Sequence, residues 1–132
     1  MELRYLAESP THKVYSHADY VYLKDKTICK SQTDYEESDE NIAWIYGEPD
    51  SAIITLDGEY VVIAGCGIVI YNIRTAEIVY LFDEPDSTEW TEGVYQNAID
   101  DVVHVRFNVC TDNNNVVTKR LNLKSHDIEV LS

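Results

Sequence analysis

Residues 51–82 read SAIITLDGEYVVIAGCGIVIYNIRTAEIVYLF, and this stretch decides the fold. It holds four short runs of apolar and β-branched residues, the residue types that favour strands. Asp57-Gly58 lies between the first two runs and is a strong signal for a hairpin turn. The later runs are separated by Gly65-Cys66-Gly67 and by the polar corner Arg74-Thr75-Ala76. Four short strands with tight connections predict an antiparallel meander.

The end of the chain repeats part of this pattern. Residues 72–81, NIRTAEIVYL, align with residues 122–131, NLKSHDIEVL, at a spacing of 50 residues. Both copies place a polar corner between two strand-like segments, which is the pattern of a hairpin. We therefore predict two four-stranded units, over residues 51–82 and about 98–131.

A repeat of this length with four strands in each copy resembles the blades of β-propellers of the WD or kelch kind. The likeness is clearest over residues 56–65 and 71–77, although the chain contains no Trp-Asp pair. A third copy is echoed faintly by LKDKTI at residues 23–28. Two or three units are too few for a ring of four or more blades. The resemblance therefore implies an all-β fold of antiparallel meanders that form an open or sandwiched sheet.

The composition is typical of one folded domain. The 132 residues are 45% hydrophobic, so we treat residues 1–132 as a single β-rich domain with a sizeable core. The cysteines Cys29, Cys66 and Cys110 lack the spacing of a metal site, and an odd number argues against obligatory disulfides. The sequence shows neither a bilayer-spanning apolar run nor a signal peptide. It predicts a cytoplasmic protein with no metal and no cofactor.

The charge of the chain is concentrated in its centre. Residues 31–105 contain 17 acidic residues and one basic residue, Arg74. The net charge of that stretch is −16, whereas the net charge of the whole chain is −14. The two flanking stretches, residues 1–30 and 106–132, each carry +1. A field of one sign repels nucleic acid and anionic lipid and attracts basic partners. The charge pattern predicts a basic protein partner, with no binding of nucleic acid or membrane.

The sequence contains no recognisable catalytic motif. HExxH, the nucleophile elbow, the P-loop and a helix-opening GxGxxG are all missing. Cys66 lies between two glycines, but glycines between strands most often serve backbone geometry. Residues 112–115, DNNN, lack the glycine and distal glutamate of an EF-hand loop, and we interpret them as a hairpin tip. We predict that the protein is not an enzyme. A small hydrolase that uses carboxylates or Cys66 stays an alternative.

Two acidic segments contain both tryptophans of the chain. Residues 34–46 and residues 83–95 each hold five acidic residues together with aromatic residues. Aromatic side chains are enriched at binding hot spots, and acidic groups around them steer a basic partner. Ile42, Trp44 and Tyr46 alternate as one face of a strand, so we predict that Trp44 is a residue of the protein core. Trp90 is predicted to be exposed. The predicted partner-binding residues are Tyr35, Glu36, Glu37, Asp39, Glu40, Asp83, Glu84, Asp86, Glu89, Trp90 and Glu92.

A small, acidic, β-rich chain without enzyme motifs resembles bacterial immunity proteins. Those proteins neutralise nuclease toxins in contact-dependent inhibition and related polymorphic toxin systems. The resemblance is one of size and charge over the whole chain. It implies one-to-one capture of a basic, nuclease-like toxin, with the acidic face in the cleft that receives the phosphate backbone. A propeller-like scaffold or peptide-binding module is the alternative among binding functions.

Overall fold

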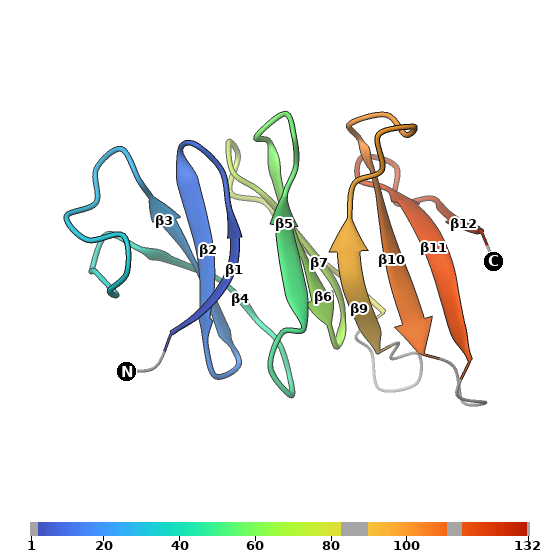
Figure 1. Cartoon of the computed structure of the whole chain (residues 1–132), viewed down its shortest axis with the longest axis horizontal. Helices are drawn as coiled ribbons and strands as arrows, with labels where there is room; N and C mark the ends of the chain where they lie inside the picture. The colour runs from blue at the N-terminus through green and yellow to red at the C-terminus, as the bar shows by residue number, and fades with distance from the viewer. Residues whose placement is uncertain (1–2, 83–89, 111–114, 132) are drawn as a thin grey trace.

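The structure is a computed structural model that describes residues 3–82, 90–110 and 115–131. Regular structure in these residues consists of twelve strands in three antiparallel four-stranded sheets, and each sheet is a meander in chain order (Figure 1). The first sheet contains β1 (Arg4–Glu8), β2 (His12–His17), β3 (Tyr20–Asp25) and β4 (Glu40–Trp44). The middle sheet contains β5 (Ser51–Ile54), β6 (Tyr60–Gly65), β7 (Gly67–Asn72) and β8 (Ile78–Leu81). The last sheet contains β9 (Thr91–Tyr95), β10 (His104–Cys110), β11 (Val116–Asn122) and β12 (Ile128–Val130).

The predicted all-β class and antiparallel meanders are confirmed. The structure has three sheets where the sequence predicted two units, and the additional sheet is formed by residues 4–44. The connection from β3 to β4 explains why the sequence showed only a faint third copy. It spans residues 26–39. The equivalent connections between the third and fourth strands span only residues 73–77 in the middle sheet and 123–127 in the last sheet. The last sheet starts at Thr91, before the expected residue 98. The sequence prediction missed β9 because this strand is short and breaks register against β10.

The repeated asparagine turn is present in atomic detail. Asn72 Oδ1 accepts hydrogen bonds from the amides two and three residues later, at 2.9 and 3.0 Å. Asn122 Oδ1 accepts the same two bonds at 2.9 and 3.0 Å. Ala76 and His126 occupy equivalent left-handed positions, with φ of 63° and 65°. In the first sheet Asp25 takes the place of asparagine, because its Oδ1 accepts the amide two residues later at 2.9 Å. The interpreted hairpin tip at 112–115 lies mostly outside the described residues.

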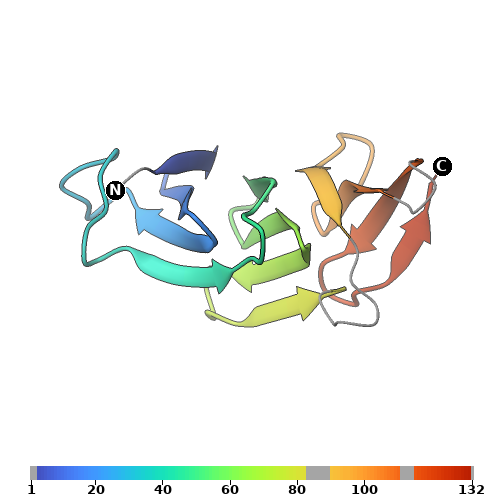
Figure 2. The ribbon, with the colours of Figure 1, turned by 90° about the horizontal axis from the view of Figure 1, so that it is seen from below.

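The three sheets stand side by side in a row. Their first strands, β1, β5 and β9, lie along one side of the row, while β4 and β8 lie along the other (Figure 2). Two apolar cores separate the sheets. Val61 and Ile63 of β6 belong to the core shared with the first sheet, and Val62 and Ala64 belong to the core shared with the last sheet. The middle sheet is therefore buried on both faces, which explains its nearly continuous apolar sequence.

The outer face of the first sheet is polar and is covered by the chain's own 26–39 connection. Lys24 alternates with core residues and therefore points away from the core. Its Nζ lies 3.0 Å from Asp39 Oδ2 and 3.2 Å from Glu36 Oε1. The hydroxyl of Tyr15 donates to Asp39 Oδ2 at 2.6 Å. These contacts attach the connection to the sheet.

The outer face of the last sheet is polar as well. Arg106 lies between core residues of β10, so its side chain points away from the core. Its Nε lies 2.7 Å from Asp100 Oδ2, and Arg120 Nη1 lies 2.9 Å from Asp100 Oδ1. The first and last sheets therefore both place ion pairs on the faces that point away from the middle sheet. Within the described residues there is also no helix of the length and apolarity needed to cross a lipid bilayer.

Candidate functional site

Four exposed aromatic residues lie next to one another, and we call them the aromatic patch: Trp44 of β4, Tyr46 of the 45–50 connection, Tyr80 of β8, and Trp90, which directly precedes β9. Between 42% and 61% of each residue is exposed. The ring centroids of Trp44 and Tyr46 are 6.3 Å apart, and those of Tyr46 and Trp90 are 6.4 Å apart. The amide of Trp44 donates to the hydroxyl of Tyr80 at 3.3 Å. The patch is therefore one continuous surface.

Trp44 is exposed because a bulge interrupts β4. Val21 pairs with Ala43, and the next residue of β3 pairs with Asn41, so Ile42 is an extra residue in the ladder. Ile42 and Ala43 are both buried as a result, and the side chain of Trp44 turns outward. The prediction that Trp44 belongs to the core is wrong, because the alternation on which it rested is broken at this bulge.

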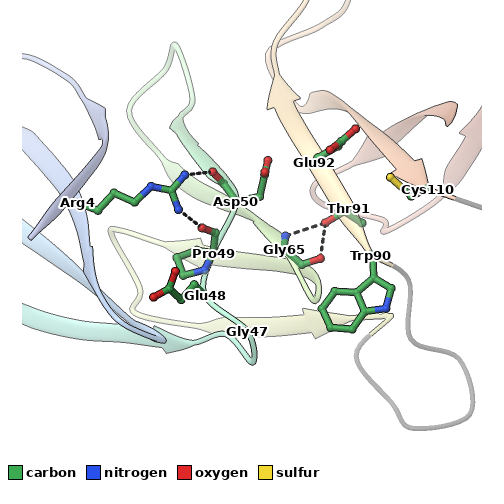
Figure 3. Close-up of a pocket in the computed structure, with 10 residues that line it drawn as sticks. All are labelled: Arg4, Gly47, Glu48, Pro49, Asp50, Gly65, Trp90, Thr91, Glu92 and Cys110. Carbon is green, nitrogen blue, oxygen red and sulfur yellow. Dashed lines mark hydrogen bonds between the residues drawn. The ribbon is translucent and has the colours of Figure 1, made fainter.

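A cavity of about 330 Å³ lies beside Trp90, where segments of the three sheets meet (Figure 3). We call it the junction pocket. Its lining includes the carboxylates of Glu48, Asp50 and Glu92 and one cationic side chain, Arg4. Tyr46 of the aromatic patch lies in the same 45–50 connection as Glu48 and Asp50. Acidic groups and exposed rings therefore border each other at this junction.

Asp50 connects the first, middle and last sheets at the junction pocket. Arg4 of β1 donates from Nη1 to the carbonyl of Pro49 at 2.5 Å and from Nη2 to the carbonyl of Asp50 at 2.7 Å (Figure 3). The amide of Gly93 in β9 donates to Asp50 Oδ2 at 3.0 Å. Because these bonds tie the loop to two neighbouring sheets, the acidic side of the site is held in place.

Thr91, the first residue of β9, fixes the start of the strand that follows Trp90. Its buried hydroxyl accepts the amide of Gly65 at 2.9 Å and donates to the carbonyl of Gly67 at 2.5 Å. A Cβ on Gly65 would lie 2.9 Å from Ile45 Cγ2, and Gly67 has a φ of 77°. Both glycines therefore serve backbone geometry, as the sequence interpretation held. Among the described residues, no group of three or more His, Cys, Asp or Glu side chains is placed to hold a metal ion.

Residues predicted from the first acidic segment lie away from the aromatic patch, mostly on the outer face of the first sheet. Glu36 and Asp39 bind Lys24, and Asp39 is buried. Hydrogen bonds from the amides of Ser31 and Lys30 hold the pKa of Glu36 at about 2.

Tyr35 and Glu40 of this segment also contact other residues of the protein. The ring of Tyr35 lies edge-on to Tyr22, with centroids 5.6 Å apart, and Glu37 is exposed. Glu40 accepts the hydroxyl of Tyr71 at 3.0 Å, and burial together with this bond raises the pKa of Tyr71 to about 12.

Two of the residues predicted from the second acidic segment lie at the candidate site, and the other four are not described by the structure. Trp90 and Glu92 both line the junction pocket. Asp83, Glu84, Asp86 and Glu89 lie outside the described residues.

Sequence reasoning missed Glu48 and Asp50, although the chain carries a signal for them. The tripeptide Glu-Pro-Asp occurs at residues 48–50 and again at 84–86. Each copy falls between two successive sheets, after β4 in one case and after β8 in the other. A search for repeats outside the strands finds this pair. A comparison with protein-family models and with curated proteins finds no match for the chain.

Proposed function

We propose that this protein captures a basic protein on the aromatic patch and the acidic rim of the junction pocket, and that the partner is a nuclease-like toxin. The observation that carries the proposal is the continuity of four exposed rings with three carboxylates, those of Glu48, Asp50 and Glu92. Tryptophan and tyrosine in such a setting are the residue types that supply most of the binding energy at protein interfaces.

The aromatic patch has the properties of a prepared interface. Exposed large apolar side chains scattered singly are common, but a contiguous group is typical of an interaction surface. Trp44 is exposed through a bulge, and Trp90 is positioned by an isolated bridge to Cys66 and by the buried hydroxyl of Thr91. Bulges are frequently used to re-aim a side chain at a functional position. The binding surface is therefore largely formed before a partner arrives.

The charge distribution supports a basic partner. The stretch of residues 31–105 has a net charge of −16 and supplies the whole aromatic patch and the three carboxylates of the acidic rim. Its single basic residue, Arg74, forms an ion pair with Glu59, with Nη2 and Oε1 3.2 Å apart. A negative field of this size accelerates encounter with a basic protein and disfavours phosphate backbones. A nuclease presents a basic cleft for phosphate, and carboxylates on this surface can occupy it.

The experiment that tests the proposal is capture of partners from the native cytoplasm and from cells that express the neighbouring reading frame. We expect retention of a basic, nuclease-like protein in a one-to-one complex, with association slowed by added salt because steering is screened. The protein should also suppress the nuclease activity of the captured partner. Retention of a basic protein whose nuclease activity stays unchanged would exclude the toxin-neutralising role.

A pair of charge variants locates the surface. Glu48→Lys combined with Glu92→Lys reverses two charges at the junction pocket. Asp101→Lys combined with Asp127→Lys makes the same change in net charge at exposed positions outside the pocket. We expect the first variant to lose binding by about 100-fold or more and the second to lose much less. Equal losses would mean that only the total charge matters and that the partner does not dock at the junction.

A further inference from the structure

A second cavity opens within the aromatic patch. It has a volume of about 300 Å³ and is lined by Trp44, Tyr46, Cys66 and Tyr80. Three of these four side chains are aromatic, and none of the four is Asp, Glu, Lys, Arg or His. We call this cavity the aromatic pocket. Its size suits one long side chain of a partner rather than a whole peptide segment.

The surroundings of the aromatic pocket select a cation. The faces of aromatic rings carry negative electrostatic potential and attract cations that approach within about 6 Å of the ring centroid. Trp90, which lies beside Tyr46, also lines the junction pocket with its three carboxylates. A cationic side chain in the aromatic pocket therefore meets aromatic faces and is attracted by the negative field of residues 31–105, whereas an anionic one is repelled by both.

The shape and chemistry of the site favour arginine over lysine. A guanidinium group is planar and weakly hydrated, so it stacks on aromatic rings more readily than an ammonium group does. Its five donors also allow it to keep hydrogen bonds while it stacks. We propose that the aromatic pocket receives one arginine side chain of the basic partner, with the guanidinium stacked against Trp44 or Tyr46. This inference rests on the proposed function, because the arginine belongs to the captured protein.

The pocket is formed in the protein without its partner. The bond from the amide of Trp44 to the Tyr80 hydroxyl joins the edge of the first sheet to the edge of the middle sheet. The bridge between Cys66 and Trp90 joins the middle sheet to the last one. A preformed site loses little conformational entropy on binding, so a small probe that carries only the arginine is sufficient to detect it.

The test uses three capped tripeptides, Gly-X-Gly, in which X is arginine, lysine or citrulline. Citrulline has nearly the shape of arginine but carries no charge. Binding is followed by NMR through the indole N–H signals of Trp44 and Trp90 in the full chain. We expect the arginine peptide to shift the Trp44 signal, and to a smaller extent the signal of Trp90 beside Tyr46, with a dissociation constant in the mM range. Citrulline should bind about tenfold more weakly. Lysine should fall between them.

Two variants provide the controls. Trp44→Leu removes a wall of the pocket and should abolish the shift that the arginine peptide causes at the remaining indole. Tyr5→Leu removes another exposed aromatic ring, one that lines neither the junction pocket nor the aromatic pocket, and it should leave binding unchanged. Equal binding of citrulline and arginine, or equal or tighter binding of lysine, overturns the inference. No shift of Trp44 with the arginine peptide overturns it as well.

Failure of this inference and failure of the proposed function give different results. A basic partner that binds wild-type protein and Trp44→Leu protein equally well overturns the arginine pocket and leaves the capture function standing. Specific binding of the arginine peptide without capture of any basic protein supports the pocket and overturns the proposed function.

Discussion

Lys24 and Asp39 form a buried ion pair on the outer face of the first sheet, with Nζ and Oδ2 3.0 Å apart and each side chain 1% exposed. Burial acts to lower the pKa of Lys24, but the hydrogen bonds to Asp39 and Glu36 outweigh it and raise that pKa. The pair attaches the 26–39 connection to the sheet. A buried charge that loses its partner is costly, so this pair is a sensitive point of the fold.

Substitution of Lys24→Met should lower the free energy of unfolding by about 3 kcal/mol or more, because Asp39 keeps a buried charge without its cation. Unfolding in urea, followed by tryptophan fluorescence, measures the change. Lys30→Met is the matched control, since Lys30 is exposed, and it should change stability by less than about 0.5 kcal/mol. Equal stability of the two variants would show that the pair does not anchor the connection.

Gly65→Ala should destabilise the protein by about 1–3 kcal/mol, because the new Cβ would lie 2.9 Å from Ile45 Cγ2 and 3.3 Å from the carbonyl oxygen of Glu48. Gly58→Ala separates crowding from backbone strain. Gly58 has a φ of 72° and nothing within 4 Å of its Cβ position, so it should show only the strain of about 1 kcal/mol. Thermal unfolding of both variants gives the comparison, and a milder effect at Gly65 than at Gly58 would contradict the close approach.

The elements that sequence predicts well are those fixed by local chemistry. Asp57-Gly58 signals the hairpin between β5 and β6, and the asparagine at the third strand of two sheets signals the repeated turn. The first sheet was faint because its equivalent turn uses Asp25 and leads into a much longer connection. The ion pair of Lys24 with Asp39 joins β3 to the last residue of that connection and follows no local sequence pattern.

The candidate site was harder to predict, since it depends on tertiary pairing. A single bulge at Ile42 moves Trp44 from the expected core position to the surface, and a bulge of this kind depends on register against β3 rather than on composition. Trp90 and Glu92 were expected at the interface and do line the junction pocket. Glu48 and Asp50 join them only because the three sheets meet there.

Asp100 should contribute stability that is lost in acid. Its hydrogen bond to Arg106, followed by that to Arg120, holds its pKa at about 2 against an ordinary value of 3.8. A carboxyl whose pKa is lowered on folding stabilises the protein fully above its unfolded pKa, and the contribution disappears as the pH falls through its folded pKa. The stability difference between wild type and Asp100→Asn should therefore be constant above about pH 4 and shrink between about pH 4 and 2. Urea unfolding at several pH values measures it, and a difference that does not vary with pH would exclude the effect.

The protein should be a monomer in dilute solution. The outer faces of the first and last sheets carry the Lys24 and Asp100 ion pairs, so neither presents an apolar face for stacking of a further sheet. In repeat proteins a polar outer face of this kind ends the stack. Light scattering at several concentrations should give the mass of one chain. A stable dimer or larger ring would favour the scaffold alternative, in which copies complete a propeller-like assembly.

Trp90 and Tyr35 distinguish the surface assigned by the structure from the one suggested by acidic composition. Both are exposed aromatic residues, but Trp90 lies in the aromatic patch, whereas Tyr35 packs edge-on against Tyr22. Trp90→Ala should weaken binding of the captured basic partner by about 2 kcal/mol or more, the size of a hot-spot loss. Tyr35→Ala should change binding by less than about 0.5 kcal/mol. Calorimetric titration with each variant tests the assignment, and a larger loss at Tyr35 would move the interface to the outer face of the first sheet.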